Sequence, residues 1–263
     1  MALGALVSIA ASTFNRVMVV ELSLLQIIPG LLLALHYFIQ ISRPNWGFLS
    51  DKGGNRTFWI IIGVIILCLG SVLACIGILL IPENYLFGLT ISIFAYTLIG
   101  IGVGASGTSL LAFLATRTDN SKKAAAATIT WIMMIFGAAF TAIFVGKIID
   151  PYSIEKLLKI VTMISLFWII TSFITLYKLE NTHKQKVLDR FEPVSITFYQ
   201  GLKQVLLEQN TRWFTIFVFL SMTAYFMQEP ILEPYAGLIF KFSVGESTQL
   251  TGCLLYTSDA ADE

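Results

Sequence analysis

Polar side chains interrupt an apolar stretch near the start of the chain in a pattern that could carry chemistry. His36, Gln40 and Arg43 recur at four- and three-residue spacing, so they share one face if the stretch is helical. A neutral imidazole can exchange hydrogen bonds, pass on a proton or ligate a metal ion. The pattern therefore leaves three roles open for His36: a hydrogen bond to a neighbouring helix, a metal ligand or a proton relay.

A second polar group lies earlier in the chain and consists of Asn15, Arg16 and Glu21. Five residues of α-helix turn Arg16 and Glu21 about 140° away from each other, so we expect no pair between them and a separate partner for each. An ionisable side chain inside a membrane marks a functional site by default, whereas an Arg near the membrane surface can extend its head group to water. Both interpretations of Arg16 stay open.

Two carboxylates, Glu229 and Glu233, stand four residues apart beside Pro230 and Pro234. They share a face only if a helix continues past both prolines, and an interior proline removes a helical hydrogen bond. We therefore expect two solvated carboxylates at the end of a helix, with a contact for a ligand or partner as the alternative.

The elements that carry these side chains are predicted to be membrane helices. Of the 263 residues, 56% are hydrophobic and 13% are charged, and the mean hydropathy is +0.80. A soluble domain is about half apolar and a quarter charged. Stretches without Asp, Glu, Lys or Arg cover residues 22–42, 58–82, 84–116, 124–146 and 160–177. Because a spanning helix needs about 20 apolar residues, the sequence predicts an all-α, multi-pass membrane protein in a lipid bilayer.

Turn residues at 82–84, 119–121 and 150–151 divide the apolar stretches into helices. Seven helices are predicted, at residues 2–22, 24–42, 58–81, 86–115, 124–149, 157–177 and 213–228. The expected organisation is a six-helix bundle (1–177), a polar linker with an amphipathic helix (178–212), and a seventh helix with the start of an eighth (213–252). Residues 253–263 turn small and acidic, and we expect them to be a non-native tail on a truncated chain.

Basic residues predict the orientation. Twelve of the 17 Lys and Arg residues fall in the segments 43–57, 117–123 and 178–212, which lie on the same side of the predicted helices. Loops that stay in the cytoplasm are enriched in Lys and Arg. The N-terminus is therefore expected on the cytoplasmic side.

A short polar segment separates the second and third predicted helices. Its glycines allow a tight turn, and its aspartate can accept hydrogen bonds from a helix N-terminus or a basic partner. The run GFLSDKGGNRT resembles a loop motif of the major facilitator superfamily through Gly47, Asp51, Lys52, Gly54 and Arg56. The resemblance implies a six-helix N-terminal bundle of that superfamily, a truncated C-terminal half, and a cytoplasmic latch that includes Asp51.

A narrower resemblance covers most of the chain. The runs NRVMVVEL (15–22), ALHYFIQISRPNWGFLSD (34–51), TFWIIIG (57–63) and QEPILEPYAG (228–237) resemble the PucC family of phototrophic bacteria, a branch of the same superfamily. This resemblance implies a protein of the cytoplasmic or photosynthetic membrane that handles chlorophyll or bacteriochlorophyll for the assembly of light-harvesting complexes. The implied cargo is a tetrapyrrole pigment and the implied partners are light-harvesting subunits.

Within that resemblance, His36 with Gln40 beside it is a candidate pigment ligand, through the magnesium of a chlorophyll, and Glu229 and Glu233 are candidate contacts for a pigment or partner. No further cofactor is implied. Two histidines and scattered carboxylates form no catalytic set, so we expect no enzyme, and a net charge of +1 argues against nucleic-acid binding. Two alternatives remain: a proton-coupled transporter of a small solute with His36 or Glu21 as the coupling site, and a non-transporting scaffold for antenna subunits.

Overall fold

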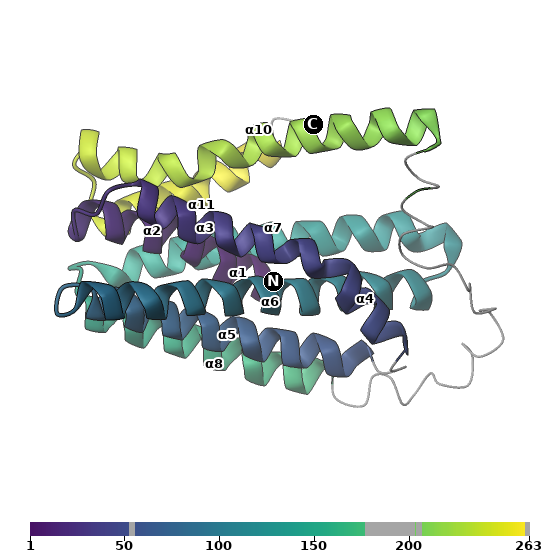
Figure 1. The fold of residues 1–263 in the computed structure, drawn as a ribbon, viewed down its shortest axis with the longest axis horizontal. Coiled ribbons are helices and arrows are strands. Elements are labelled where there is room, and N and C mark those ends of the chain that lie inside the picture. Colours follow the sequence, from purple (N-terminus) through teal and green to yellow (C-terminus); the bar gives the residue numbers. More distant parts are fainter. Residues whose placement is uncertain (53–55, 177–202, 204–206, 261–263) are drawn as a thin grey trace.

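The computed structural model describes residues 1–52, 56–176, 203 and 207–260, and the secondary structure of this part is helical, with no strand. The long helices lie lengthwise beside one another, with α10 along the upper edge of the view and α8 along the lower edge (Figure 1). The all-α class expected from the apolar stretches is confirmed.

The first helix runs from Ala2 to Glu21 and alternates between two helix types. It consists of α1 (Ala2–Ser8), the π-helical η1 (Ile9–Thr13), α2 (Phe14–Arg16) and the π-helical η2 (Val17–Glu21). It is the most buried of the five candidate membrane spans in the described part of the chain. Because protein surrounds it, its polar side chains meet other helices.

The second helix differs from the prediction at both ends. It comprises α3 (Ile27–Ile39), the 3₁₀ turn η3 (Gln40–Ser42) and α4 (Arg43–Lys52), so the expected helix at 24–42 starts later and the expected loop at 43–57 is helical as far as Lys52. Packing explains this difference: a Cβ at Gly47 would lie 3.3 Å from Thr108 of α6, so α4 lies directly on α6. Tertiary packing of this kind overrides the weak helix propensity of glycine.

Four long helices follow as the sequence predicted. They are α5 (Arg56–Leu80), α6 (Tyr85–Arg117), α7 (Lys123–Ile149) and α8 (Ile154–Leu176), with a short 3₁₀ turn, η4 (Asn120–Lys122), before α7. The turns between them fall at the predicted turn residues. Asn84 caps α6 by accepting a hydrogen bond from the Phe87 amide at 3.2 Å, which satisfies a backbone donor that the first helical turn leaves free.

Small residues hold α5 and α6 close together. A Cβ at Gly63 would lie 2.5 Å from the Ser106 amide nitrogen, and a Cβ at Gly102 would lie 2.5 Å from that of Leu67. Glycines at a helix contact let two backbones approach, which is a common way for membrane helices to associate. The glycine-rich run at 100–107 is therefore a packing surface.

The last two helices are longer than expected. The predicted helix at 213–228 is α10, which runs from Gln209 to Ile239 through both prolines, and α11 extends from Val244 to Ala260. Thus α11 continues through most of the segment expected to be a tail. The predicted linker at 178–212 lies outside the described residues as far as 202 and at 204–206, so its amphipathic helix stays a prediction.

Five described helices are long and apolar enough to cross a membrane: Ala2–Glu21, α5, α6, α7 and α8. The predicted spans at 24–42 and 213–228 are not among them. α3 has only 13 residues before the helix tightens into η3, which is short of the roughly 17 that a span needs. In α10, polar residues lower the hydropathy of the second half.

Candidate functional site

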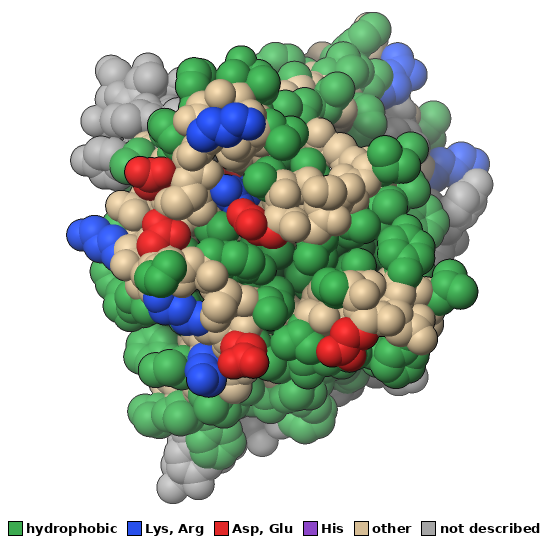
Figure 2. All heavy atoms as spheres, turned by 90° about the vertical axis from the view of Figure 1, so that its left-hand side faces the viewer, with side chains coloured by type: hydrophobic (Ala, Val, Ile, Leu, Met, Phe, Trp, Pro, Cys, Tyr) green, Lys and Arg blue, Asp and Glu red, His purple; other side chains and the backbone are tan. Residues whose placement is uncertain are grey.

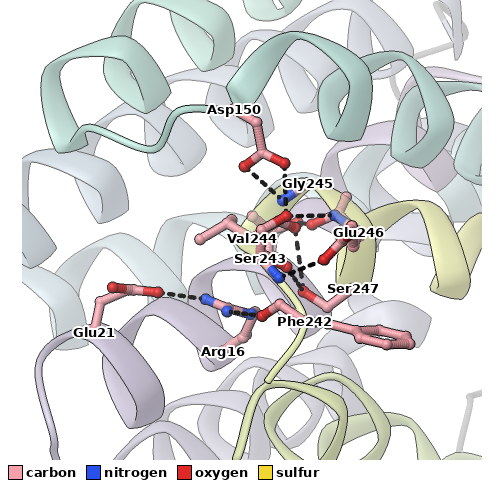
Figure 3. Close-up of polar contacts among 11 residues, drawn as sticks. Arg16, Glu21, Asp150, Phe242, Ser243, Val244, Gly245, Glu246 and Ser247 are labelled. Carbon is pink, nitrogen blue, oxygen red and sulfur yellow. Dashed lines mark hydrogen bonds and ion pairs between the residues drawn. The ribbon is translucent and has the colours of Figure 1, made fainter. Parts of the chain in front are cut away.

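The turns after the first helix, α5, α7 and α10 lie together at one end of the molecule, on the left of Figure 1. Seen from this end, side chains of both charge signs lie among the turns and are surrounded by hydrophobic side chains (Figure 2). The close-up in Figure 3 shows that the charged groups there meet across elements that are far apart in the sequence.

Arg16 and Asp150 are the two charged residues that make most of these contacts, and they define the polar cluster at this end. Arg16 Nη1 donates to Glu21 Oε1 at 2.7 Å, and its Nη2 donates to the backbone carbonyl of Phe242 at 2.8 Å (Figure 3). The Arg16 side chain is 2% exposed. The expectation of separate partners for Arg16 and Glu21 was wrong, and Arg16 extends into the protein rather than out to the membrane surface.

The π-helical stretch η2 explains the pair. A π-turn joins residue i to i+5, as the bond from the Leu22 amide to the Val17 carbonyl at 3.1 Å shows. Residues five apart therefore come round to the same side of the helix. The predicted angle of about 140° holds only for an unbroken α-helix.

Asp150, in the turn between α7 and α8, joins the bundle to the start of α11. Its Oδ2 accepts from the Ser243 hydroxyl at 2.6 Å and its Oδ1 accepts from the Gly245 amide at 3.2 Å (Figure 3). A carboxylate is favoured at a helix N-terminus, where free amides carry partial positive charge. A Cβ at Gly245 would lie 2.3 Å from the Gly146 carbonyl oxygen, so only glycine allows this close contact.

The start of α11 also has a capping box. The Ser243 hydroxyl accepts from the Glu246 amide at 3.1 Å, and Glu246 Oε2 accepts from the Ser243 amide at 2.9 Å. The same hydroxyl donates to Asp150. Sequence reasoning missed this group, although the spacing S-x-x-E at 243–246 is a recognisable start signal for a helix.

Asn15 satisfies a backbone carbonyl that a proline leaves free. Its Nδ2 donates to the Pro230 carbonyl at 2.5 Å. In a regular helix this carbonyl would accept from the amide of residue 234, but Pro234 has no amide hydrogen. The side chain of the first helix thus replaces the missing hydrogen bond inside α10.

Glu233 is buried, contrary to the prediction. It is 1% exposed, and its Oε1 accepts from the Thr251 hydroxyl of α11 at 2.7 Å. The prediction failed because α10 continues past Pro234 and packs against the first helix and α11. The side chain of Glu229 lies outside the described residues.

His36, Gln40 and Arg43 form a second group of polar contacts, separate from those of Arg16 and Asp150. Their contacts run along the second helix. The Nε2 atoms of His36 and Gln40 are 2.8 Å apart, and Arg43 Nη2 donates to Gln40 Oε1. His36 is 1% exposed, whereas Arg43 is exposed. Its hydrogen-bond partner lies on its own helix rather than on a neighbouring one, and its Nδ1 has no partner among the described residues.

The described residues of the loop motif lie in α4 and at the start of α5. Gly47 and Asp51 belong to α4, Lys52 ends it, and Gly54 and the side chains of Asp51 and Lys52 lie outside the described residues. Arg56 begins α5 and donates to the Ala112 carbonyl of α6 at 3.0 Å. The latch role of the motif stays a prediction.

The cluster around Arg16 and Asp150 and the contacts of His36, Gln40 and Arg43 differ in what they can do. The cluster around Arg16 and Asp150 is an anchor, because charged and capping hydrogen bonds tie the hairpin of α10 and α11 to the other helices. The contacts of His36, Gln40 and Arg43 form a polar path from a buried imidazole to an exposed guanidinium. No group of three His, Cys, Asp or Glu side chains that could hold a metal ion occurs in the part of the chain that the structure describes.

Comparisons with known proteins give one consistent family. Residues 13–256 match the family described as PUCC protein. The chain is 51% identical over 250 residues to the bacteriochlorophyll synthase 44.5 kDa chain of Rhodobacter capsulatus, covering 95% of this chain and 58% of that protein. It is 25% identical over 266 residues to protein PucC of Cereibacter sphaeroides, covering 95% of this chain and 57% of that protein. The chain therefore spans little more than half the length of these relatives.

Proposed function

The chain belongs to the PUCC protein family, and from this premise we propose that it handles chlorophyll or bacteriochlorophyll in the membrane during the assembly of light-harvesting complexes. The observation that carries the proposal is the 51% identity, over 95% of the chain, to a relative whose name refers to bacteriochlorophyll. The five candidate membrane spans provide the apolar surroundings that a hydrophobic pigment needs.

The proposal assigns the pigment contact to His36 with Gln40. A buried imidazole in an apolar helix bundle is a suitable polar contact for an otherwise apolar cargo, because a few well-placed polar groups fix the orientation of a ligand in an apolar site. The six helices before residue 178 form the first half of a major facilitator superfamily bundle in this proposal, and the N-terminus lies in the cytoplasm. The partners are the subunits of the light-harvesting complex.

Pigment co-purification tests the proposal. The chain is expressed in a host that makes bacteriochlorophyll, purified in mild detergent, and examined by absorption spectroscopy beside the His36→Ala variant. Bound pigment in the wild type and less in the variant supports the proposal, and bound pigment in both places the contact elsewhere. A colourless wild type that is folded by circular dichroism overturns it.

The name of the first relative also contains the word synthase, so the same purified chain is assayed for turnover of bacteriochlorophyll precursors. We expect no turnover, because the proposed role is to bind and pass on a finished pigment. Turnover that depends on the chain would show an enzyme activity and would overturn the proposed carrier function. Pigment-free binding of antenna subunits would replace it by a scaffold.

A second candidate function is proton-coupled transport of a small solute, and Glu233 is the observation that favours it. A carboxyl group that is 1% exposed inside a helix bundle is a common proton-coupling site in transporters. Glu21 suits this role less well, because it pairs with Arg16 at the end of the bundle. Solute uptake driven by a pH gradient in vesicles, lost in Glu233→Gln but kept in Glu21→Gln, would support this candidate.

A further inference from the structure

The contacts of His36, Gln40 and Arg43 determine which ring nitrogen of His36 carries the proton. Arg43 has only donors, so its contact requires the oxygen of the Gln40 side-chain amide. The amide nitrogen of Gln40 then lies 2.8 Å from His36 Nε2 and donates to it. A neutral imidazole that accepts at Nε2 carries its hydrogen on Nδ1. The side chains therefore fix His36 as a donor at Nδ1.

This donor is buried and has no partner among the described residues. His36 is 1% exposed, and Nδ1 makes no hydrogen bond there. Leaving a buried donor without a hydrogen bond is costly, so such a group in a native protein calls for an explanation. The backbone around it is closely packed, because a Cβ at Gly100 of α6 would lie 2.8 Å from the His36 carbonyl oxygen. The helix position of His36 is therefore fixed, while its Nδ1 donor has no partner in the described part of the chain.

We propose that His36 donates a hydrogen bond from Nδ1 to a carbonyl oxygen on the rim of the bound chlorophyll or bacteriochlorophyll, rather than ligating its magnesium. The inference rests on the proposed function and specifies the contact. These pigments carry keto and ester carbonyl groups at the edge of the macrocycle, which accept hydrogen bonds. In an apolar site such a bond is stronger than in water, because no solvent competes for the donor.

The alternative, magnesium ligation, needs a free ring nitrogen with its lone pair available. Nε2 is the only such atom in the fixed tautomer, and the Gln40 amide already occupies it. Ligation would therefore break the contact between His36 and Gln40 and leave the Gln40 amide without that acceptor. A bond from Nδ1 uses the unsatisfied donor and breaks no contact in the group.

Resonance Raman spectroscopy of the co-purified pigment tests the inference, because the stretching frequency of a carbonyl falls when it accepts a hydrogen bond. Wild type, His36→Leu and His36→Asn are compared. The amide nitrogen of asparagine lies near the position of the imidazole Nδ1, so His36→Asn keeps a donor there. We expect a lowered carbonyl frequency in wild type and His36→Asn, and a frequency typical of a free carbonyl in His36→Leu.

The outcomes separate this inference from the proposed function. A wild type that binds pigment with free carbonyl frequencies overturns the inference alone. The same holds if the magnesium coordination bands change in His36→Leu while the carbonyl frequency does not, since that result assigns His36 to the metal. A colourless wild type overturns the proposed function and this inference with it. If His36→Leu loses its pigment, the carbonyl band of His36→Asn decides.

Discussion

Arg16 and Glu21 form an ion pair across one π-helical turn, with Nη1 and Oε1 2.7 Å apart. The Arg16 side chain is 2% exposed and the Glu21 side chain is 34% exposed, so a partly exposed carboxylate neutralises a buried cation. Arg16 also binds the Phe242 carbonyl at 2.8 Å. The pair therefore ties the first helix to the turn between α10 and α11.

The ion pair predicts that removing only Glu21 destabilises the protein more than removing both charges. Glu21→Ala leaves the buried guanidinium without its counter-ion, and we expect it to lower the free energy of unfolding by about 2 kcal/mol. The double variant Arg16→Met/Glu21→Ala removes both charges and should be more stable than Glu21→Ala, because no charge stays buried and unpaired. Denaturation in mild detergent measures both. Equal stability of the single and double variants would contradict the coupling.

The contact between Asn15 and the Pro230 carbonyl predicts a dependence on Pro234. Asn15→Ala leaves a carbonyl unsatisfied inside the bundle and should cost about 1–3 kcal/mol of unfolding free energy. In a Pro234→Ala background the amide of residue 234 can donate to the Pro230 carbonyl, so the same Asn15→Ala change should cost clearly less. The four variants form a double-mutant cycle in detergent. A cost that is the same in both backgrounds would argue against this role of Asn15.

Gly245 is expected to tolerate no side chain. In Gly245→Ala the new Cβ would lie 2.3 Å from both the Gly146 carbonyl oxygen and Asp150 Oδ2, so α11 must move away from α7. Overpacking of this kind costs about 1–3 kcal/mol, and we expect a lower melting temperature. Gly30→Ala in α3 is the matched control, because a Cβ there meets nothing within 4 Å. The control should be neutral or stabilising, since alanine favours helix by about 1 kcal/mol.

Tyr152, in the turn between α7 and α8, predicts a loss of stability at alkaline pH. Burial, and next the nearby Glu21 carboxylate, raise the pKa of the Tyr152 phenol above its usual value of about 10. The folded chain then holds this proton more tightly than the unfolded chain. The protonated Tyr152 therefore contributes fully to the free energy of unfolding below pH of about 10, and this contribution is lost as the pH rises further. Melting temperatures from pH 8 to 11 measure this.

Tyr152→Phe is the control for the alkaline prediction, because it removes the ionising hydroxyl and keeps the ring. We expect its melting temperature to fall less steeply above pH of about 10 than that of wild type. Parallel curves for the two proteins would assign the alkaline loss to other groups.

Four of the long helices and the turns between them were predictable from the sequence. Apolar length and turn residues are local properties, so α5, α6, α7 and α8 and the turns at 82–84, 119–121 and 150–151 could be read directly. The helical continuation through Gly47 and past Pro234 could not be read in this way. Glycine and proline predict breaks locally, but packing of α4 on α6 and of α10 on the first helix decided otherwise.

The partners of the polar side chains follow from the way the helices pack. The sequence identified Asn15, Arg16 and His36 as candidates because polar groups in apolar helices need partners, whereas it predicted Glu233 to be solvated at a helix end. It could not identify those partners, since Asn15 and Pro230 are 215 residues apart and Arg16 and Phe242 are 226 apart. Even the local pair of Arg16 and Glu21 depends on a π-turn, which no residue type in this segment predicts. Contacts between helices follow from packing of whole surfaces, and residue type alone does not encode that packing.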